Sequence, residues 1–499
     1  MAISNPGGLL NSVPGPIQQA TASNYLDLAS QANQGWAQQY VPDLMEKEAE
    51  VFGPRTISGF LSQVGAEEAM TADQVVWSEQ ARLHLSYTCS ITDVDDGGGS
   101  ATNGGEITIT DHIDTNATYT AGSHGIRPND TVIVSTTAAV LKCIVVRIDT
   151  DVISVEPYGV GDITTLGEGN TGTLLVYGSE FAKGTTYNSA SGANATATDR
   201  RGSNEASFKS YSNKPIILKD YYEVSGSDAS RIGWVEVSSE MGMNGYLWYL
   251  KAEADTRSRF IDYIEMAMLE GELGVSGTDD VADFLTANAD TSGTQGLFAA
   301  IESRGNVTTG VTGVNAATDL AEFDAILAEF DKQGAIEEYM MFVNRSTSLA
   351  IDDMLASMNS YGAGGTSYGV FDNDENMALN LGFSGFRRGS YDFYKSDFRY
   401  LNDLATRGGI NATAGANAIR GVMVPAGMNS VYDQQVGMNM KRPFLHVRYR
   451  ASQTDDRRFK TWVTGSVGAA TSALDAMQVH MLSERCLITQ GANNFMLMK

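Results

Sequence analysis

Two glycine- or acid-rich motifs in this 499-residue chain have residue types that occur in binding sites. Gly167, Gly169 and Gly172 have the GxGxxG spacing of a dinucleotide-binding loop. Such a loop must leave a strand and open a helix, so that the amides at the helix start meet the phosphates. Here the next residues are TLLVYG, which predict a strand, so we interpret the three glycines as turn residues.

The second motif is DNDENM at Asp372–Met377, which has oxygens at the first, third and fifth positions of a calcium loop. Its sixth position is Met377, where glycine is needed. Its twelfth is Phe383, where a bidentate glutamate should lie. We therefore interpret this stretch as a solvated acidic loop.

The other reactive residue types show no catalytic spacing. The five histidines lack HExxH and i,i+4 pairs, and no GxSxG or GxxxxGK[ST] sequence occurs. Cys89, Cys143 and Cys486 form no CxxC pair, which supports neither a disulfide framework nor a thiolate metal site. Adjacent acids are expected by chance among 60 carboxylates, and a glycosidase pair stays an open alternative. We predict a protein that is not an enzyme, with no catalytic residues, no metal and no cofactor.

The amino-acid composition narrows the class of protein further. The 34 Lys and Arg against 60 Asp and Glu give a net charge of −26, which argues against a free-standing nucleic-acid binder. The hydrophobic fraction of 42% is enough for a sizeable core, while 52 glycines suit a β-rich, loop-rich protein. The start lacks a Sec signal and no apolar stretch is long enough to cross a membrane. These features predict a soluble protein made in a reducing cytoplasm.

The elements that would position any site follow from local patterns. Residues 1–39 carry one charge and three prolines, which predicts an extended arm that orders only against another surface. We expect a short helix at 42–52 and a strand at 75–88. Short β-like runs from 89 to about 185, with a hairpin turn at Asp149-Thr150-Asp151, predict a small all-β module. A low-complexity stretch at 188–207 leads out of the module into an extended return segment.

A long helix is expected next. Apolar residues at threes and fours predict a helix from Ser239 to Glu270, about 48 Å long, that stops at Gly271. Residues 319–430 alternate helix and strand, with a helix over 319–334, a strand at 339–344 and a helix capped by Asn344 or Ser346. That alternation predicts an α/β lobe, after which the last strands return to an earlier sheet.

Charge divides unevenly along the chain. Residues 381–499 hold fifteen Lys and Arg against eight Asp and Glu, a net +7, which leaves −33 for the remainder. This division suggests head-to-tail contacts between copies. Pairing within one subunit is an equal alternative, and a DNA-facing role is a third. Because adjacent cations are hard to satisfy inside one subunit, our candidate intersubunit contacts are Arg387, Arg388, Lys441, Arg442, Arg457 and Arg458.

Two segments and the order of elements resemble a known family. SNKPIILKDYYEVSGSDASRIG, with the turn Val224-Ser225-Gly226-Ser227, is similar to the return arm of an extension loop. YLKAEADTRSRFIDYIEMAMLEGE is similar to the end of a spine helix, and the residues that match are Arg257, Arg259, Asp262, Glu265 and Gly271. Over about residues 60–495 the chain thus resembles the major capsid proteins of tailed bacteriophages, which have the Hong Kong 97-type capsid fold. The uncharged arm, the insertion and the size also resemble crAss-like phages.

The resemblance implies an α+β fold with five parts. They are an N-terminal arm (1–60), an extension loop (61–226) carrying an inserted β module at about 90–185, a peripheral domain with the spine helix (227–318), an α/β axial domain (319–430) and closing strands of the peripheral domain (431–499). The β module departs from the minimal family plan.

The resemblance also implies a function. Copies would assemble, in the bacterial host cytoplasm, into hexamers and pentamers of an icosahedral virion shell around double-stranded DNA, without sequence-specific binding and with no membrane. Implied partners are the portal and possible scaffolding, head auxiliary or decoration proteins. An alternative is another virion or surface-array β protein, such as a tail or adhesin component. An acidic secreted hydrolase is disfavoured by the missing signal peptide.

Overall fold

The computed structural model describes most of the chain after residue 65. The described residues are 66–80, 86–94, 105–113, 119–159, 163–181, 183, 208–227, 237–238, 244–245, 247–274, 293–333, 336–359, 385–426, 428–433, 438–467 and 470–499. They divide into two compact units, one within 78–211 and one from the residues on either side of that range. The expected arm at 1–39, the helix at 42–52, the stretch 188–207 and the acidic loop Asp372–Met377 lie outside the described residues.

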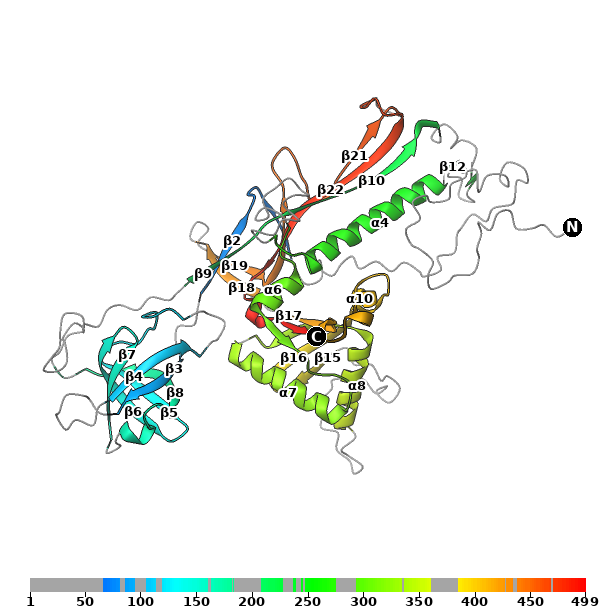
Figure 1. Ribbon diagram of the computed structural model, residues 1–499. Helices are drawn as coiled ribbons and strands as arrows, with labels where there is room; N and C mark the ends of the chain where they lie inside the picture. Colours follow the sequence, from blue (N-terminus) through cyan, green and yellow to red (C-terminus); the bar gives the residue numbers. More distant parts are fainter. Residues whose placement is uncertain are drawn as a thin grey trace. The chain divides into compact units, whose positions relative to one another are not determined.

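The unit within 78–211 is all β. Six antiparallel strands, which are labelled in Figure 1, close into a barrel in the order β3-β4-β7-β6-β5-β8. Their bounds are β3 Ser86–Asp93, β4 Gly105–His112, β5 Asp130–Thr136, β6 Val140–Asp149, β7 Val152–Pro157 and β8 Thr171–Ser179. Inward side chains alternate along the strands, as in Cys89 and Ile91 of β3, and a short 3-10 helix, η2 (Ile163–Leu166), adds two more core residues. The predicted hairpin at 149–151 is confirmed, because β6 ends at Asp149 and β7 begins at Val152.

The second unit contains a long sheet with a helix along it. The strands run β1-β20-β22-β10, and β21 also pairs with β22. The bounds are β1 Glu67–Met70, β10 Ile216–Ser225, β20 Leu445–Arg450, β21 Lys460–Gly465 and β22 Ala476–Thr489. Helix α4 (Leu247–Glu270) lies along β10 and β22 (Figure 1), where Phe260 and Ile264 pack on Val479 and Met481.

The start of α4 differs from the sequence prediction. The helix begins at Leu247 rather than Ser239, and at 24 residues it is about 36 Å long. The preceding residues instead pair as two short strands, β11 (Val237–Ser238) and β12 (Asn244–Gly245). Its end is as predicted, since the Gly271 amide donates to the Ala267 carbonyl at 3.0 Å. A Cβ at Gly271 would lie 2.6 Å from the Thr294 carbonyl oxygen, so only glycine allows this close approach.

A second sheet has six strands in the order β13-β23-β17-β14-β16-β15. Their bounds are β13 Asn306–Thr308, β14 Glu338–Val343, β15 Gly385–Arg388, β16 Tyr391–Asp397, β17 Gly421–Pro425 and β23 Met496–Met498. Helices α7 (Ala316–Gln333) and α8 (Arg345–Asn359) share a core with Tyr339, Met341 and Val343 of β14. Both helices and β14 are confirmed where the sequence predicted them, and the Asn344 side chain accepts from the Thr347 amide at 2.8 Å as the N-cap.

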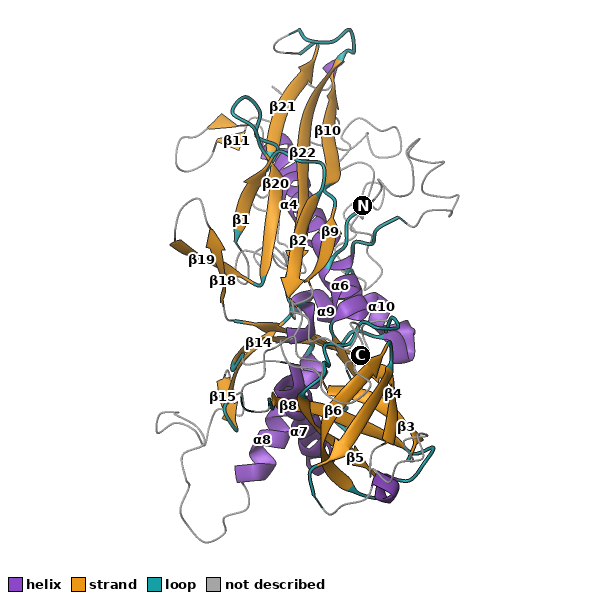
Figure 2. Ribbon diagram, turned by 90° about the vertical axis from the view of Figure 1, so that its left-hand side faces the viewer, coloured by secondary structure: helices purple, strands orange, loops and turns teal. Residues whose placement is uncertain are grey.

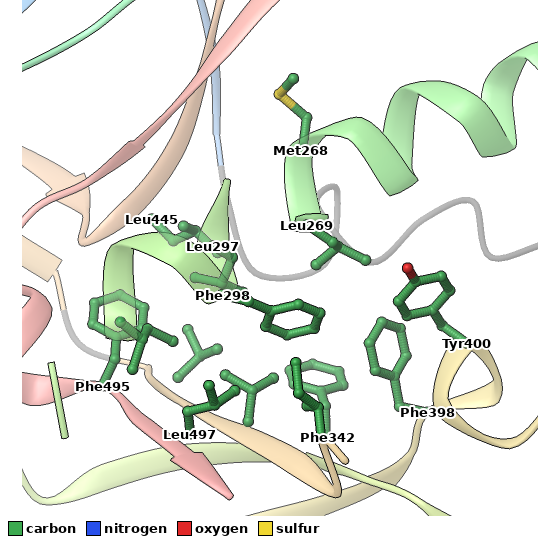
Figure 3. Close-up of a cluster of buried hydrophobic side chains, with 14 of the residues drawn as sticks. Met268, Leu269, Leu297, Phe298, Phe342, Phe398, Tyr400, Leu445, Phe495 and Leu497 are labelled. Carbon is green, nitrogen blue, oxygen red and sulfur yellow. The ribbon is translucent and has the colours of Figure 1, made fainter. Parts of the chain in front are cut away.

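The opposite face of the six-stranded sheet joins the two sheets of this unit. Figure 3 shows Phe342, Phe495 and Leu497 in one cluster with Leu297 and Phe298, together with Met268 and Leu269 at the end of α4. The smaller elements are α6 Leu297–Arg304, α9 Arg399–Asn402, α10 Arg407–Ala414, η6 Gly415–Asn417, η7 Ala492–Asn494 and the pair β18 Met428–Asp433 and β19 Met438–Pro443. This cluster joins α4 and the long sheet to the α/β lobe.

The strand predicted over 75–88 is two strands. β2 (Val75–Gln80) pairs with β9 (Phe208–Asn213) in a separate two-stranded sheet, whereas β3 begins at Ser86 inside the barrel. An unbroken run of β-forming residues thus serves two different sheets, which local propensity does not distinguish.

Candidate intersubunit surface

The cations Arg457 and Arg458 lie in the segment that connects β20 to β21, two strands of the long sheet. Arg457 Nε is 3.0 Å from Glu484 Oε2, and Arg458 NH2 is 2.5 Å from Glu67 Oε2. The Glu484 side chain is only 5% exposed, so it forms a buried counter-charge. Each of these two arginines therefore has a carboxylate partner in its own chain.

Arg387 and Arg388 lie on β15, an edge strand of the six-stranded sheet. Arg388 binds Asp324 of α7 with two bonds, Nε to Oδ1 at 2.6 Å and NH2 to Oδ2 at 2.7 Å. This fork raises the pKa of Arg388 above its ordinary value. Arg387 is held more loosely, with Nε 3.6 Å from Asp392 Oδ1 and its side chain 62% exposed.

Lys441 and Arg442 lie on β19, where their backbones pair with Ser430 and Asn429 of β18. For these two residues the structure describes the backbone only. The six candidates belong to three different parts of the chain, which are β15, β19 and the segment before β21.

The premise behind these candidates is wrong for the four described arginines. Adjacent cations are satisfied inside one chain here, since each of the four has a carboxylate partner. Sequence spacing could not reveal these pairs, because Glu484, the partner of Arg457, lies on β22 and Glu67, the partner of Arg458, lies on β1. Their role between copies stays a prediction, and it is best placed at Arg387 and Arg458, whose side chains are the most exposed of the four.

The motifs with possible chemistry have structural roles. Gly167 and Gly169 have positive φ, +73° and +76°, in the turn between η2 and β8, so the predicted turn is confirmed for these two. For Gly172 the prediction is wrong, because this residue lies within β8, opposite Cys89 of β3. Burial raises the pKa of the Cys89 and Cys143 thiols to about 11 and that of Cys486 to about 12, which keeps them protonated. Among the described residues no group of His, Cys, Asp and Glu is arranged to hold a metal ion. No helix in the described ranges is long and apolar enough to cross a membrane.

Comparisons with known proteins give matches only at the level of structure. No protein-family model matches the sequence, and no curated protein matches it. The structure is similar to one from Microbacterium phage Oxtober96, at 9% identity and a TM-score of 0.36, over 92% of this chain and 96% of that one.

Two further similar structures have titles that name capsids. The first, "Capsid structure of the Cyanophage P-SCSP1u", has 8% identity and a TM-score of 0.34 and covers 93% of this chain and 95% of that one. The second, from the bacteriophage PhiM1 mature capsid, has 9% identity and a TM-score of 0.31 and covers 62% and 79%. The similarity to phage capsid structures is the result of the comparison.

Proposed function

We propose that this chain is a structural shell subunit, the major capsid protein of a tailed double-stranded DNA bacteriophage. The observation that carries the proposal is the order of elements in the second unit. A 24-residue helix lies along a long sheet whose strands come from before and after the α/β lobe. The Hong Kong 97-type fold has this arrangement of spine helix, peripheral sheet and axial domain.

Within that proposal the parts take the following roles. The arm is 1–60, the extension loop 61–226 with the barrel inserted, the peripheral domain 227–318 with the closing strands 431–499, and the axial domain 319–430. Copies form hexamers and pentamers that enclose DNA, with portal and auxiliary proteins as partners and no cofactor. A tail or adhesin component is the alternative, favoured by one observation, the closed β-barrel.

Negative-stain microscopy of the purified full-length chain tests the proposal. Polyhedral shells or ring-shaped capsomers are the expected result. Rods or fibres would favour the alternative, and small monodisperse particles at every concentration would contradict both.

The barrel is expected to be dispensable for assembly. Its buried core residues come only from its own strands and η2 and the segments between them. Strand β3 pairs with β8, with Ser86 opposite Leu175, so the first and last strands of the barrel are neighbours. Removing residues 86–179 and joining Leu85 to Glu180 through a short Gly/Ser linker should leave shell formation intact.

Two measurements check this expectation. The first is electron microscopy of the deletion variant, and the second is thermal unfolding of an isolated 82–183 fragment, followed by circular dichroism. The fragment should unfold cooperatively. An insoluble deletion variant together with an unfolded fragment would contradict an independent barrel.

Charge reversal at Arg387 tests the surface between copies. Because its side chain is mostly solvated and its ion pair is long, Arg387→Glu should change the free energy of unfolding by about 0.5 kcal/mol or less. Assembly, measured by light scattering, should be slowed or blocked. Lys332→Glu on α7, which also reverses one exposed cation of an ion pair, is the matched control. Unchanged assembly of Arg387→Glu would remove this residue from the intersubunit surface.

A further inference from the structure

Strand β1 has few apolar contacts with the sheet on which it lies. It is four residues long and pairs in parallel with β20, at the edge of the described strands (Figure 2). Of its residues only Met70 is buried. A four-residue edge strand with one buried apolar side chain gains little from the hydrophobic effect, since one such side chain contributes about 1.5–3 kcal/mol.

Charged contacts hold β1 instead. Carboxylates of β1 and of the turn that follows it bind arginines from three parts of the sheet. The pairs are Glu67 with Arg458 (2.5 Å) and Arg485 (3.2 Å), Glu68 with Arg448 (2.7 Å), and Asp73 with Arg450. Backbone contacts continue the pairing at both ends, because the Val447 amide donates to Ala66 and the Ala451 amide donates to Met70.

The arginines need these carboxylates. Five described arginines lie at this part of the sheet: Arg448, Arg450, Arg457, Arg458 and Arg485. Glu67, Glu68 and Asp73 pair with four of them, and Glu484 of β22 pairs with Arg450 at 2.6 Å and with Arg457 at 3.0 Å. Burial lowers the pKa of Arg485, and Glu67 opposes that effect, as does Glu265 of α4 more weakly. Undocking of β1 would thus remove the Glu67 and Glu68 carboxylates from Arg448, Arg458 and Arg485.

We propose that β1 is a releasable latch strand, which docks on β20 and leaves it as a unit under the control of ionic strength. Salt screens exposed charges most, and two of the four pairs have an exposed member, because Asp73 is 94% and Arg458 54% exposed. The Debye length falls from about 14 Å at 0.05 M to about 3 Å at 1 M. The apolar cores, in contrast, keep their stability in salt. Undocking exposes the β20 edge and an arginine cluster, and it frees the segment through which the chain enters β2.

Hydrogen exchange of the purified full-length chain tests this at 0.05 M and 1 M NaCl. Peptides covering 66–71 and 445–451 should lose protection by about tenfold or more at the higher salt, because four ion pairs weaken together. Peptides from β5 and β6, whose partners are apolar, should change by less than about twofold. Protection that is equal at both salt concentrations in the β1 and β20 peptides would overturn the proposal. Sedimentation at each salt concentration confirms that particles of equal size are compared.

A charge-swap cycle separates charge from backbone pairing. Glu68→Arg and Arg448→Glu each place like charges together and should each lower β1 protection at low salt by about tenfold. The double variant restores an opposite-charge pair and should regain most of that protection. Glu329→Lys, which breaks an exposed pair on α7, is the control and should leave β1 unchanged. Equal protection in all four members of the cycle, or no recovery in the double variant, would show that charge does not hold β1.

Discussion

Replacing Arg420 with alanine is expected to lower the free energy of unfolding by about 3 kcal/mol, among the largest effects of a single substitution in this chain. Its guanidinium group binds backbone carbonyls from two segments. Arg420 NH2 donates to Thr309 at 2.8 Å and to Gly310 at 2.7 Å, NH1 donates to Val311, and Nε donates to Lys499 at 3.0 Å. Its loss leaves these half-buried carbonyls without their charged donor.

The loop that Arg420 binds is itself strained. Val311 has φ +59°, a conformation that a β-branched residue rarely adopts and that costs about 1–2 kcal/mol. The amides of the loop bind carboxylates of α7, with Val311 to Glu322 at 2.5 Å and Gly313 to Asp319 at 3.0 Å. Arg420 therefore completes a set of contacts that holds the strained backbone, and removing it takes away the donor that the loop shares with the Lys499 carbonyl.

Urea denaturation followed by tryptophan fluorescence measures the effect. Arg420→Lys keeps the charge but loses the planar fork, so it should fall between wild type and alanine. Arg399→Ala removes an exposed arginine of α9 and should change the stability by less than about 0.5 kcal/mol. A loss below about 1 kcal/mol for Arg420→Ala would mean that the loop is held by Glu322 and Asp319 alone.

Asn213→Asp should be at least as damaging at neutral pH, with a loss of about 3 kcal/mol or more. Asn213 is 1% exposed. Its Nδ2 donates to the Leu487 carbonyl at 2.6 Å and the Gln295 carbonyl at 2.9 Å, while its Oδ1 accepts from the amides of Lys214 and Gln295, both at 2.8 Å. A carboxylate in this place keeps the acceptor but turns both donors into a buried charge against two carbonyls.

The loss of stability in Asn213→Asp should also depend on pH, in a direction that can be worked out. Burial and the two carbonyls raise the pKa of the introduced carboxyl above its unfolded value of about 3.9. A group with a raised folded pKa stabilises the fold at low pH and loses that contribution as the pH rises through the folded pKa. The deficit of Asn213→Asp against wild type should therefore shrink between pH 7 and pH 5. Asn493→Asp, where a single long bond of 3.5 Å is involved, should show a small and nearly constant difference. A constant deficit for Asn213→Asp would contradict a buried charge.

The elements that sequence could predict are those with local periodicity. Helix α7 has Phe323, Ile326 and Phe330 on one face, at a spacing that is typical of a helix. Helix α8 has Asn344 as its N-cap, a residue type that marks a helix start in the sequence. The start of α4 could not be placed, because the polar residues before Leu247 fit a helix and a turn equally well. Gly242 and Gly245 were the only local signals against a helix there.

The candidate surface could not be predicted for a different reason. Ion pairs depend on side chains brought together by the sheet, and Glu67 meets Arg485 across 418 positions of sequence. Counting charges located the basic region but did not show which of its cations are paired within the chain. The pairing is decided by the register of β1 on β20 and of β20 on β22.

The long sheet also determines the order in which parts of the chain can fold during synthesis. Two of its strands, β20 and β22, lie in the last 55 or so residues, and the buried bond between Asn213 and Leu487 spans 274 positions. At about 5–20 residues per second, a ribosome needs roughly 25–100 s for these 499 residues. The barrel, whose strands are contiguous in sequence, can fold within the first half of that time, whereas β1 and β10 wait for partners that emerge last. A nascent chain thus carries a folded barrel and an incomplete sheet, and a ribosome-associated chaperone would have its longest opportunity to bind at β1.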